Sequence, residues 1–168
     1  MKTLITILLS LLTLVSYSQT KLDLEVFKII NEYRVSNGLK KLIWSTEAFV
    51  VTETHNNYMV KTGKLCHGEP IDIPNHKEIQ DLGERFIDKG VSYSYLGENV
   101  ACVLYSDSLL PYISRSIVNN WINSKSHNEL LLNKNVMLGS VSTSLVGRKK
   151  LTYSDITGHC FATFNAFK

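Results

Sequence analysis

The last strand-like stretch of the chain is Cys160-Phe161-Ala162-Thr163-Phe164-Asn165-Ala166-Phe167. Two sets of residues alternate along it, as in a β-strand with two different faces: Phe161, Thr163, Asn165 and Phe167, and Ala162, Phe164 and Ala166. Residues 136–145 and the apolar segment 98–105 also have β character. These segments predict a small antiparallel sheet built mainly from the later part of the chain.

Most segments that precede these strands have the 3.6-residue period of amphipathic helices. The first covers residues 22–33 and stops at Asn37-Gly38. A second begins after Ser45, a good N-cap residue, and stops at Gly63. Because helices come first and strands mostly later, the predicted class is α+β with a small antiparallel sheet.

Three further helices are predicted from capping signals and apolar periodicity. They are Asn75-His76-Lys77-Glu78 through Phe86 to Gly90, Leu110 through Trp121, and Ser126-His127-Asn128-Glu129 through Leu131. The first and third are expected to open with capping boxes, and the second accepts Pro111 in its first turn.

The N-terminus has the three parts of a secretory signal peptide. Lys2 supplies a positive charge, residues 4–15 form an apolar run, and small residues stand at Ser16 and Ser18. The run is shorter than the roughly 18–20 residues that a membrane anchor needs, and no later segment is long and apolar enough to span a bilayer. We expect cleavage near Ser18, a single mature domain over residues 19–168, and secretion to the extracellular medium or a bacterial periplasm.

The charge balance argues against a nucleic-acid partner. The 168 residues include 18 lysines and arginines and 15 aspartates and glutamates, which gives a formal net charge of +3 at pH 7. No block of like charge extends beyond pairs, whereas nucleic-acid-binding proteins carry a stronger basic patch. The sequence leaves the oligomeric state open.

Three cysteines, Cys66, Cys102 and Cys160, permit one disulfide, and none has C-x-x-C spacing. Cys102 and Cys160 both lie in strand-like segments, which makes them the favoured pair. A core of this size does not need a disulfide, so three buried thiols are the alternative. Catalysis by Cys66 would need a neighbouring base, and the adjacent His67 faces a different direction in most backbone geometries.

The usual catalytic signatures are absent from the sequence. It has no H-E-x-x-H zinc motif, no G-x-S-x-G nucleophile elbow, and no Walker or dinucleotide-binding glycine pattern. What remains is a scattered set of polar motifs: Lys64-Leu65-Cys66-His67, Gly97-Glu98-Asn99-Val100-Ala101, and Trp121 leading to Ser124 and His127.

The order of motifs along the chain is specific where each motif alone is weak. It runs Asn31, Arg34, Gly38-Leu39, Leu42, Trp44, His55, Met59, His67, residues 97–101, Trp121, Ser124, His127 and Gly139. This order resembles the CAP superfamily of cysteine-rich secretory proteins, antigen 5 and pathogenesis-related proteins, also called the SCP domain. The resemblance spans residues 24–167 and is greatest to the bacterial secreted branch. It implies an α-β-α sandwich with a small antiparallel sheet between helical layers.

The resemblance also implies a cleft with two histidines and two acidic residues. The matching positions here are His67, Glu98 and His127. The second acidic position falls in the segment 121–124, which has no carboxylate, so Ser124 is expected to line the cleft there. Some family members bind zinc or another divalent ion, which here would be held by His67 and His127.

Two interpretations of these residues stay open. Neutral imidazoles bind Zn²⁺ well, and Glu98 could orient a histidine or take a proton from a bound water. Alternatively, the three residues form a hydrogen-bonded polar cluster that fixes residues 97–101 against the helices. His55 shares a helical face with Val51 and Met59, which favours a satisfied core or cleft-wall histidine over a ligand.

The favoured function is a secreted CAP-domain protein of unassigned molecular activity that is not an enzyme. It would bind a small molecule, a lipid or a cell-surface component through the cleft of His67, Glu98 and His127 or through an adjacent apolar groove. The alternative is a metal-dependent hydrolase, with an ion on the two histidines and Glu98 as its catalytic residue. A third hypothesis is a structural or interaction protein whose polar cluster only stabilises the fold.

Overall fold

The computed structural model describes residues 18–73, 76–147 and 158–168. The predicted signal peptide falls on residues 1–17 and Ser18, almost entirely outside the described residues, so it stays a prediction. The elements are α1 (Lys21–Ser36), β1 (Ile43–Trp44), α2 (Thr46–Thr62), β2 (Glu69–Ile73), β3 (His76–Gln80), α3 (Leu82–Asp88), β4 (Leu96–Tyr105), the 3₁₀ turn η1 (Leu110–Tyr112), α4 (Ile113–Ile122), α5 (Lys125–Leu131), β5 (Leu138–Gly147) and β6 (Gly158–Phe167).

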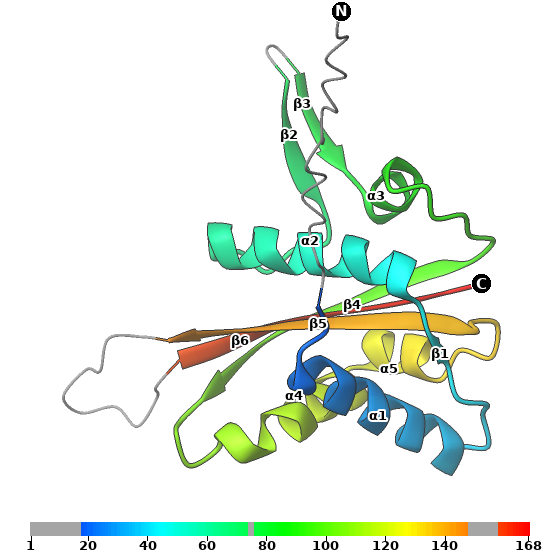
Figure 1. The fold of residues 1–168 in the computed structure, drawn as a ribbon, viewed down its shortest axis with the longest axis vertical. Coiled ribbons are helices and arrows are strands. Elements are labelled where there is room, and N and C mark those ends of the chain that lie inside the picture. Colours follow the sequence, from blue (N-terminus) through cyan, green and yellow to red (C-terminus); the bar gives the residue numbers. More distant parts are fainter. Residues whose placement is uncertain (1–17, 74–75, 148–157) are drawn as a thin grey trace, which may run out of the picture.

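The main sheet has four strands in the order β1-β5-β6-β4. Strand β6 is antiparallel to both of its neighbours, and the short β1 pairs in parallel with β5. Helix α2 covers one face of the sheet, and α1, α4 and α5 cover the other (Figure 1). The molecule is therefore a mixed α+β sandwich with the sheet between helical layers, which confirms the predicted fold class. Strand β4 is left at one edge of the sheet.

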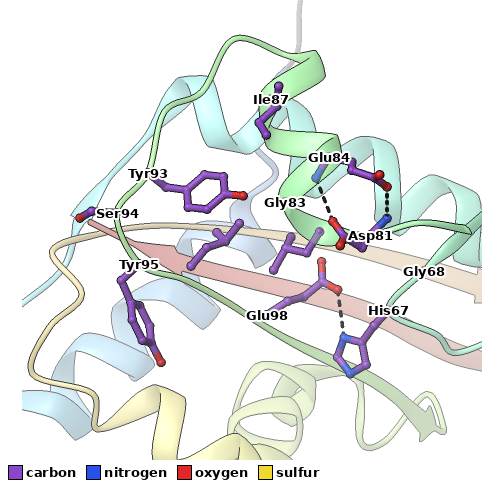
Figure 2. A pocket seen from close by; sticks show the side chains of 12 residues that line it. His67, Gly68, Asp81, Gly83, Glu84, Ile87, Tyr93, Ser94, Tyr95 and Glu98 are labelled. Carbon is purple, nitrogen blue, oxygen red and sulfur yellow. Dashed lines mark hydrogen bonds and ion pairs between the residues drawn. The ribbon is translucent and has the colours of Figure 1, made fainter.

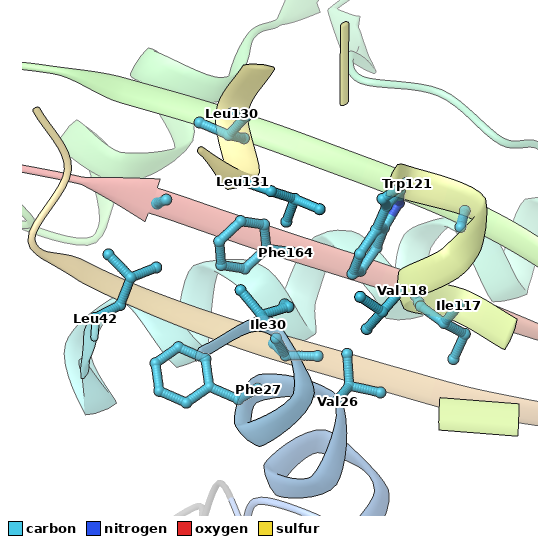
Figure 3. Close-up of a cluster of buried hydrophobic side chains, with 14 of the residues drawn as sticks. Val26, Phe27, Ile30, Leu42, Ile117, Val118, Trp121, Leu130, Leu131 and Phe164 are labelled. Carbon is cyan, nitrogen blue, oxygen red and sulfur yellow. The ribbon is translucent and has the colours of Figure 1, made fainter. Parts of the chain in front are cut away.

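Strand β6 is buried on both faces, and its two sets of alternating residues meet different surroundings. Phe164 packs against Trp121 of α4, with ring centroids 6.0 Å apart, in the apolar core that α1 completes (Figure 3). On the other face Asn165 donates a hydrogen bond to the Thr52 hydroxyl of α2 at 3.0 Å. The period-2 prediction for this strand is thus confirmed: one face packs in the apolar core, and the other combines hydrogen-bonded polar residues with Phe161 and Phe167.

Helix α1 is joined to the sheet through its N-terminal capping box. The Thr20 hydroxyl accepts from the backbone N–H of Asp23, and the Asp23 carboxylate accepts from that of Thr20. Asp23 is buried, and its Oδ1 also accepts from the backbone N–H and the hydroxyl of Thr143 in β5, at 2.7 and 2.6 Å. Burial raises the pKa of this carboxyl despite these bonds.

The predicted helix from Asn75 to Gly90 is wrong in its first part. Residues 76–80 form β3, which pairs with β2 as an antiparallel hairpin. Helix α3 begins only at Leu82, because Asp81 caps it: its carboxylate accepts from Glu84 N–H, and the Glu84 carboxylate accepts from Asp81 N–H, both at 2.9 Å. The true capping box therefore lies at 81–84 instead of 75–78, and Asn75 itself lies outside the described residues.

The capping box predicted at Ser126 is also wrong. The N-cap of α5 is Ser124, and the helix begins at Lys125 and ends at Leu131. Ser126 therefore lies within the first turn. The short helix itself and its C-terminal end agree with the prediction.

No disulfide joins the three cysteines, all of which lie in the described part of the chain. Cys102 and Cys160 occupy neighbouring strands, but the register pairs Cys102 with Phe161 and Cys160 with Val103. Adjacent positions along a strand face opposite sides of the sheet, so the predicted pair is wrong. Only Cys160 is buried, and burial raises the pKa of its thiol to about 12.

Candidate functional site

A buried cluster of ion-paired side chains lies next to the start of the edge strand β4. Nη2 of Arg85, in α3, donates to both carboxylate oxygens of Glu98 in β4, at 3.1 and 2.9 Å. Nη1 of the same guanidinium donates to Oε1 of Glu69 at 3.2 Å. The side chains of Arg85 and Glu98 are only 4% and 2% exposed. Arg85 therefore neutralises Glu98 in a site shielded from water and fixes its orientation.

His55 of α2 completes this cluster. Its ring is fully buried, with Nδ1 2.7 Å from Oε1 of Glu69 and Nε2 2.8 Å from the carbonyl oxygen of Cys66. Both ring nitrogens of His55 therefore have polar partners, one a carboxylate and the other a backbone carbonyl. Burial alone would raise the pKa of Glu69, but hydrogen bonds from His55 and Arg85 lower it overall. The prediction of a satisfied, buried His55 is confirmed.

His67 connects the buried cluster to the surface. It lies in the loop after α2, which Gly63 ends in the left-handed conformation at φ +67°. Its side chain is 58% exposed, and its Nδ1 donates to Oε1 of Glu98 at 3.0 Å (Figure 2). With Nδ1 occupied by the carboxylate, Nε2 is the ring atom left to meet a ligand.

His127 approaches the same region from α5, on the other side of β4. The amide of Asn99 in β4 donates to the carbonyl of His127 at 2.9 Å and ties α5 to the strand. Gly97 permits this close packing, since a Cβ there would lie 2.5 Å from Cδ1 of Leu130. Nδ1 of His127 is buried and has no hydrogen-bond partner among the described residues. Desolvation, and to a smaller extent the charge of His67, lower the pKa of His127.

Two hollows meet at these residues. One, of about 720 Å³, lies between α3 and β4, and the other, of about 360 Å³, lies between β4 and α5. Both are lined by His67, Tyr95 and Glu98, so together they form one depression along the strand, here called the edge groove. Figure 2 shows Tyr93, Tyr95, Glu98 and His67 around the first hollow.

The structure thus brings three of the four predicted site residues to one place. His67, Glu98 and His127 line the same hollow, but Ser124 is not among its lining residues. Ser124 is the N-cap of α5, and Ser126 lines the hollow in its place. The edge groove is acidic: its described lining includes no lysine or arginine, and its carboxylates are Asp81, Glu84, Glu98 and Glu129.

Glu98 is not free to serve as a ligand of a zinc ion beside His67 and His127. Both oxygens of Glu98 already accept hydrogen bonds from Arg85, and one also accepts from His67. A cation bound there would face the guanidinium across a shared carboxylate. Among the described residues, no three or more His, Cys, Asp or Glu side chains are grouped so that they could hold a metal ion. The geometry is that of an ion-paired cluster with two histidines at its rim.

The sequence interpretation missed Glu69 and Arg85. A signal for Arg85 was present: it lies three residues after Leu82 and one before Phe86, next to the apolar face of α3. A charged residue at such a position must find a buried partner. Nothing in the sequence indicated that the partners are Glu69 and Glu98, because those pairs form only in the folded chain.

The family follows from comparison of the whole sequence. The sequence profile of the family described as "CAP: Cysteine-rich secretory protein family" matches residues 27–145, which is more than half of the chain. The chain belongs to the CAP family. No curated protein sequence matches it significantly.

Solved structures of bacterial CAP-type proteins share the fold. An extracellular protein containing an SCP domain from Bacillus anthracis is 22% identical, with a TM-score of 0.62 over 91% of this chain. An outer surface protein from Borrelia burgdorferi is 18% identical, with a TM-score of 0.61; the match covers 90% of this chain and 96% of that one. A cysteine-rich secretory protein from Staphylococcus aureus is 18% identical, with a TM-score of 0.57 over 88% of this chain. This CAP domain spans only 45% of the Bacillus protein and 38% of the Staphylococcus protein.

His127 of this CAP domain is expected to titrate below the usual histidine value of 6.5, because burial and the charge of His67 disfavour its protonated form. Because folding lowers this pKa, the contribution of His127 to the free energy of unfolding is fully present above pH 6.5. It is lost as the pH falls through the lowered pKa. The Cε1–H resonance of His127, followed by ¹H NMR, reports the value directly. In His67→Gln the pKa should rise towards 6.5, whereas His159→Gln should leave it unchanged; an unshifted His127 in the wild type would contradict the site geometry.

Proposed function

We propose that this CAP protein is exported and binds a neutral or cationic ligand in the edge groove, without metal and without catalysis. The observation that carries the proposal is the ion pair between Arg85 and Glu98. This ion pair holds the Glu98 carboxylate in a structural role. Glu98 in turn orients His67, whose side chain is exposed at the surface. The result is a preformed recognition surface, which suits binding more than proton transfer.

The charge of the groove favours one class of ligand. Asp81, Glu84 and Glu129 line it beside the ion-paired Glu98, and its described lining includes no lysine or arginine, so a phosphate or fatty-acid carboxylate would meet repulsion. Neutral hydroxyl-rich groups can pair with its histidines and carboxylates, and ammonium groups are attracted. Tyr93 and Tyr95 line the same groove and offer flat rings for sugars or cations. A segment of a surface polysaccharide or a basic peptide therefore fits better than a lipid.

Export is supported by two independent observations. The N-terminus carries the charged, apolar and small-residue pattern of a signal peptide, and two of the similar structures are named as extracellular or outer surface proteins. Within the described residues, no helix combines the length and hydropathy needed to cross a bilayer.

The proposal is tested by titrating the protein with three short probes of different charge. These are a tetramer of N-acetylglucosamine, tetralysine and tetraglutamate, with the Cε1–H resonances of His67 and His127 followed by ¹H NMR. The neutral or the cationic probe should shift both resonances, and tetraglutamate should shift neither. His159 of β6 provides an internal control, because it pairs with Leu104 at the end of β4 that is distant from Glu98. Shifts with tetraglutamate alone, or no shift with any probe, would contradict the proposal.

A further inference from the structure

A separate hollow, of about 460 Å³, lies at the opposite edge of the sheet from the edge groove on β4. It is formed by the turn after α1, strand β1 and the segment that leads into β5. Three exposed lysines line it, Lys40, Lys41 and Lys134, and its described lining includes no carboxylate. This depression, here called the basic hollow, therefore has a charge opposite to that of the edge groove.

Exposed apolar side chains stand among these lysines. Ile43 is 64% exposed and Met137 is 54% exposed, and both line the basic hollow. Large apolar side chains exposed together with lysines form an amphipathic surface. Such a surface matches the boundary of a bilayer, where phosphates lie above the first part of the acyl chains.

A buried arginine fixes the backbone of the two segments that carry these lysines. Arg34 of α1 is 1% exposed and donates from Nε to the carbonyl of Lys40 at 3.0 Å. Its Nη1 donates to the carbonyls of Leu131 and Asn133, at 2.7 and 3.0 Å. One side chain thus connects the turn that carries Lys40 and Lys41 to the loop that carries Lys134. The backbone that carries the three lysines is therefore fixed by hydrogen bonds, and the buried guanidinium adds positive charge near their ammonium groups.

We propose that the basic hollow docks the protein on a bilayer that contains anionic phospholipids. Lys40, Lys41 and Lys134 would contact lipid phosphates, while Ile43 and Met137 enter the interface. A soluble phosphate would account for the lysines but would leave the two apolar side chains in water. Docking through this edge leaves β4, at the other edge of the sheet, free to bind a ligand. The proposal does not depend on the function assigned to the edge groove.

Sedimentation with lipid vesicles tests it. The exported form of the protein, with its N-terminus defined by mass spectrometry, is mixed with vesicles of phosphatidylglycerol and phosphatidylcholine in equal parts, or of phosphatidylcholine alone. We expect binding only to the anionic vesicles and a decrease with added salt. Because each lysine near an anionic surface contributes about 1 kcal/mol, Lys40→Gln/Lys41→Gln/Lys134→Gln should lower the partition coefficient roughly 100-fold. All three are exposed, so the variant should fold, which circular dichroism checks.

Two further variants decide between the alternatives. Lys21→Gln/Lys61→Gln/Lys125→Gln makes the same change in net charge at exposed positions elsewhere and should retain most of the binding. Ile43→Ser/Met137→Ser keeps all lysines and should weaken binding several-fold. Equal losses in the two lysine variants would show a diffuse charge effect and overturn the proposal. It would also be overturned by unchanged binding of the serine variant, by no binding of the wild type, or by lysine-dependent binding of inorganic phosphate without vesicle binding.

Discussion

Arg85→Met is expected to lower the free energy of unfolding by about 3–5 kcal/mol, the usual cost of removing one partner from a buried ion pair. Methionine has nearly the length of the arginine stem but brings no charge and no N–H donor. Among the described residues, Glu98, which is 2% exposed, would then keep ionic contacts only with His55 and His67, and Glu69 only with His55. Urea unfolding, followed by circular dichroism, measures the loss.

Two companion variants separate this effect from a general loss of packing. In Arg85→Met/Glu98→Gln the unpaired carboxylate is removed as well, so much of the stability should return. Lys89→Met removes an exposed cation one residue after α3 and should change stability by less than about 0.5 kcal/mol. If Arg85→Met were as stable as the wild type, the ion-paired cluster would have no structural role.

Trp121→Ala is expected to destabilise the protein by a similar amount, about 3–5 kcal/mol, because it empties a large volume in the core. Trp121 is fully buried, packs on Phe164, and donates from Nε1 to the carbonyl of Val100 at 3.2 Å. Since Val100 follows Glu98 by two positions on β4, the same side chain also supports the strand that bears the site. Chemical denaturation measures the change.

The matched variant Trp121→Phe retains most of the ring volume and loses the hydrogen bond. Its cost should be smaller, about 1–3 kcal/mol, because the carbonyl of Val100 is left without that donor. Equal losses for alanine and phenylalanine would assign the effect to the hydrogen bond and contradict the packing argument.

The sequence predicts those parts of this fold whose pattern is set by local geometry. The alternation in residues 160–167 survives because β6 is central, so each of its faces meets a different layer. Helix α1 and helix α2 are likewise predicted, since their caps lie within a few residues of their apolar stripes. The helix predicted from Asn75 fails because a local capping pattern cannot show that residues 76–80 pair with β2 instead.

The candidate site is likewise predicted only in part. The order of motifs identifies His67, Glu98 and His127, and the fold gathers them around one hollow. The ionic partners escape prediction, because Arg85 lies 13 and 16 residues from Glu98 and Glu69 and its pairing depends on how α3 packs. That pairing changes the chemistry, since Glu98, predicted as a residue that could take a proton from a bound water, is instead one half of a buried ion pair.

The most direct test of the central claim, that the edge groove binds its ligand without a metal, is the probe titration on chelator-treated protein. With EDTA present, the tetramer of N-acetylglucosamine or tetralysine should still shift the resonances of His67 and His127, and Zn²⁺ added after removal of the chelator should not strengthen that binding. Binding that disappears with the chelator and returns with zinc would contradict the claim and would make the same cleft a metal centre.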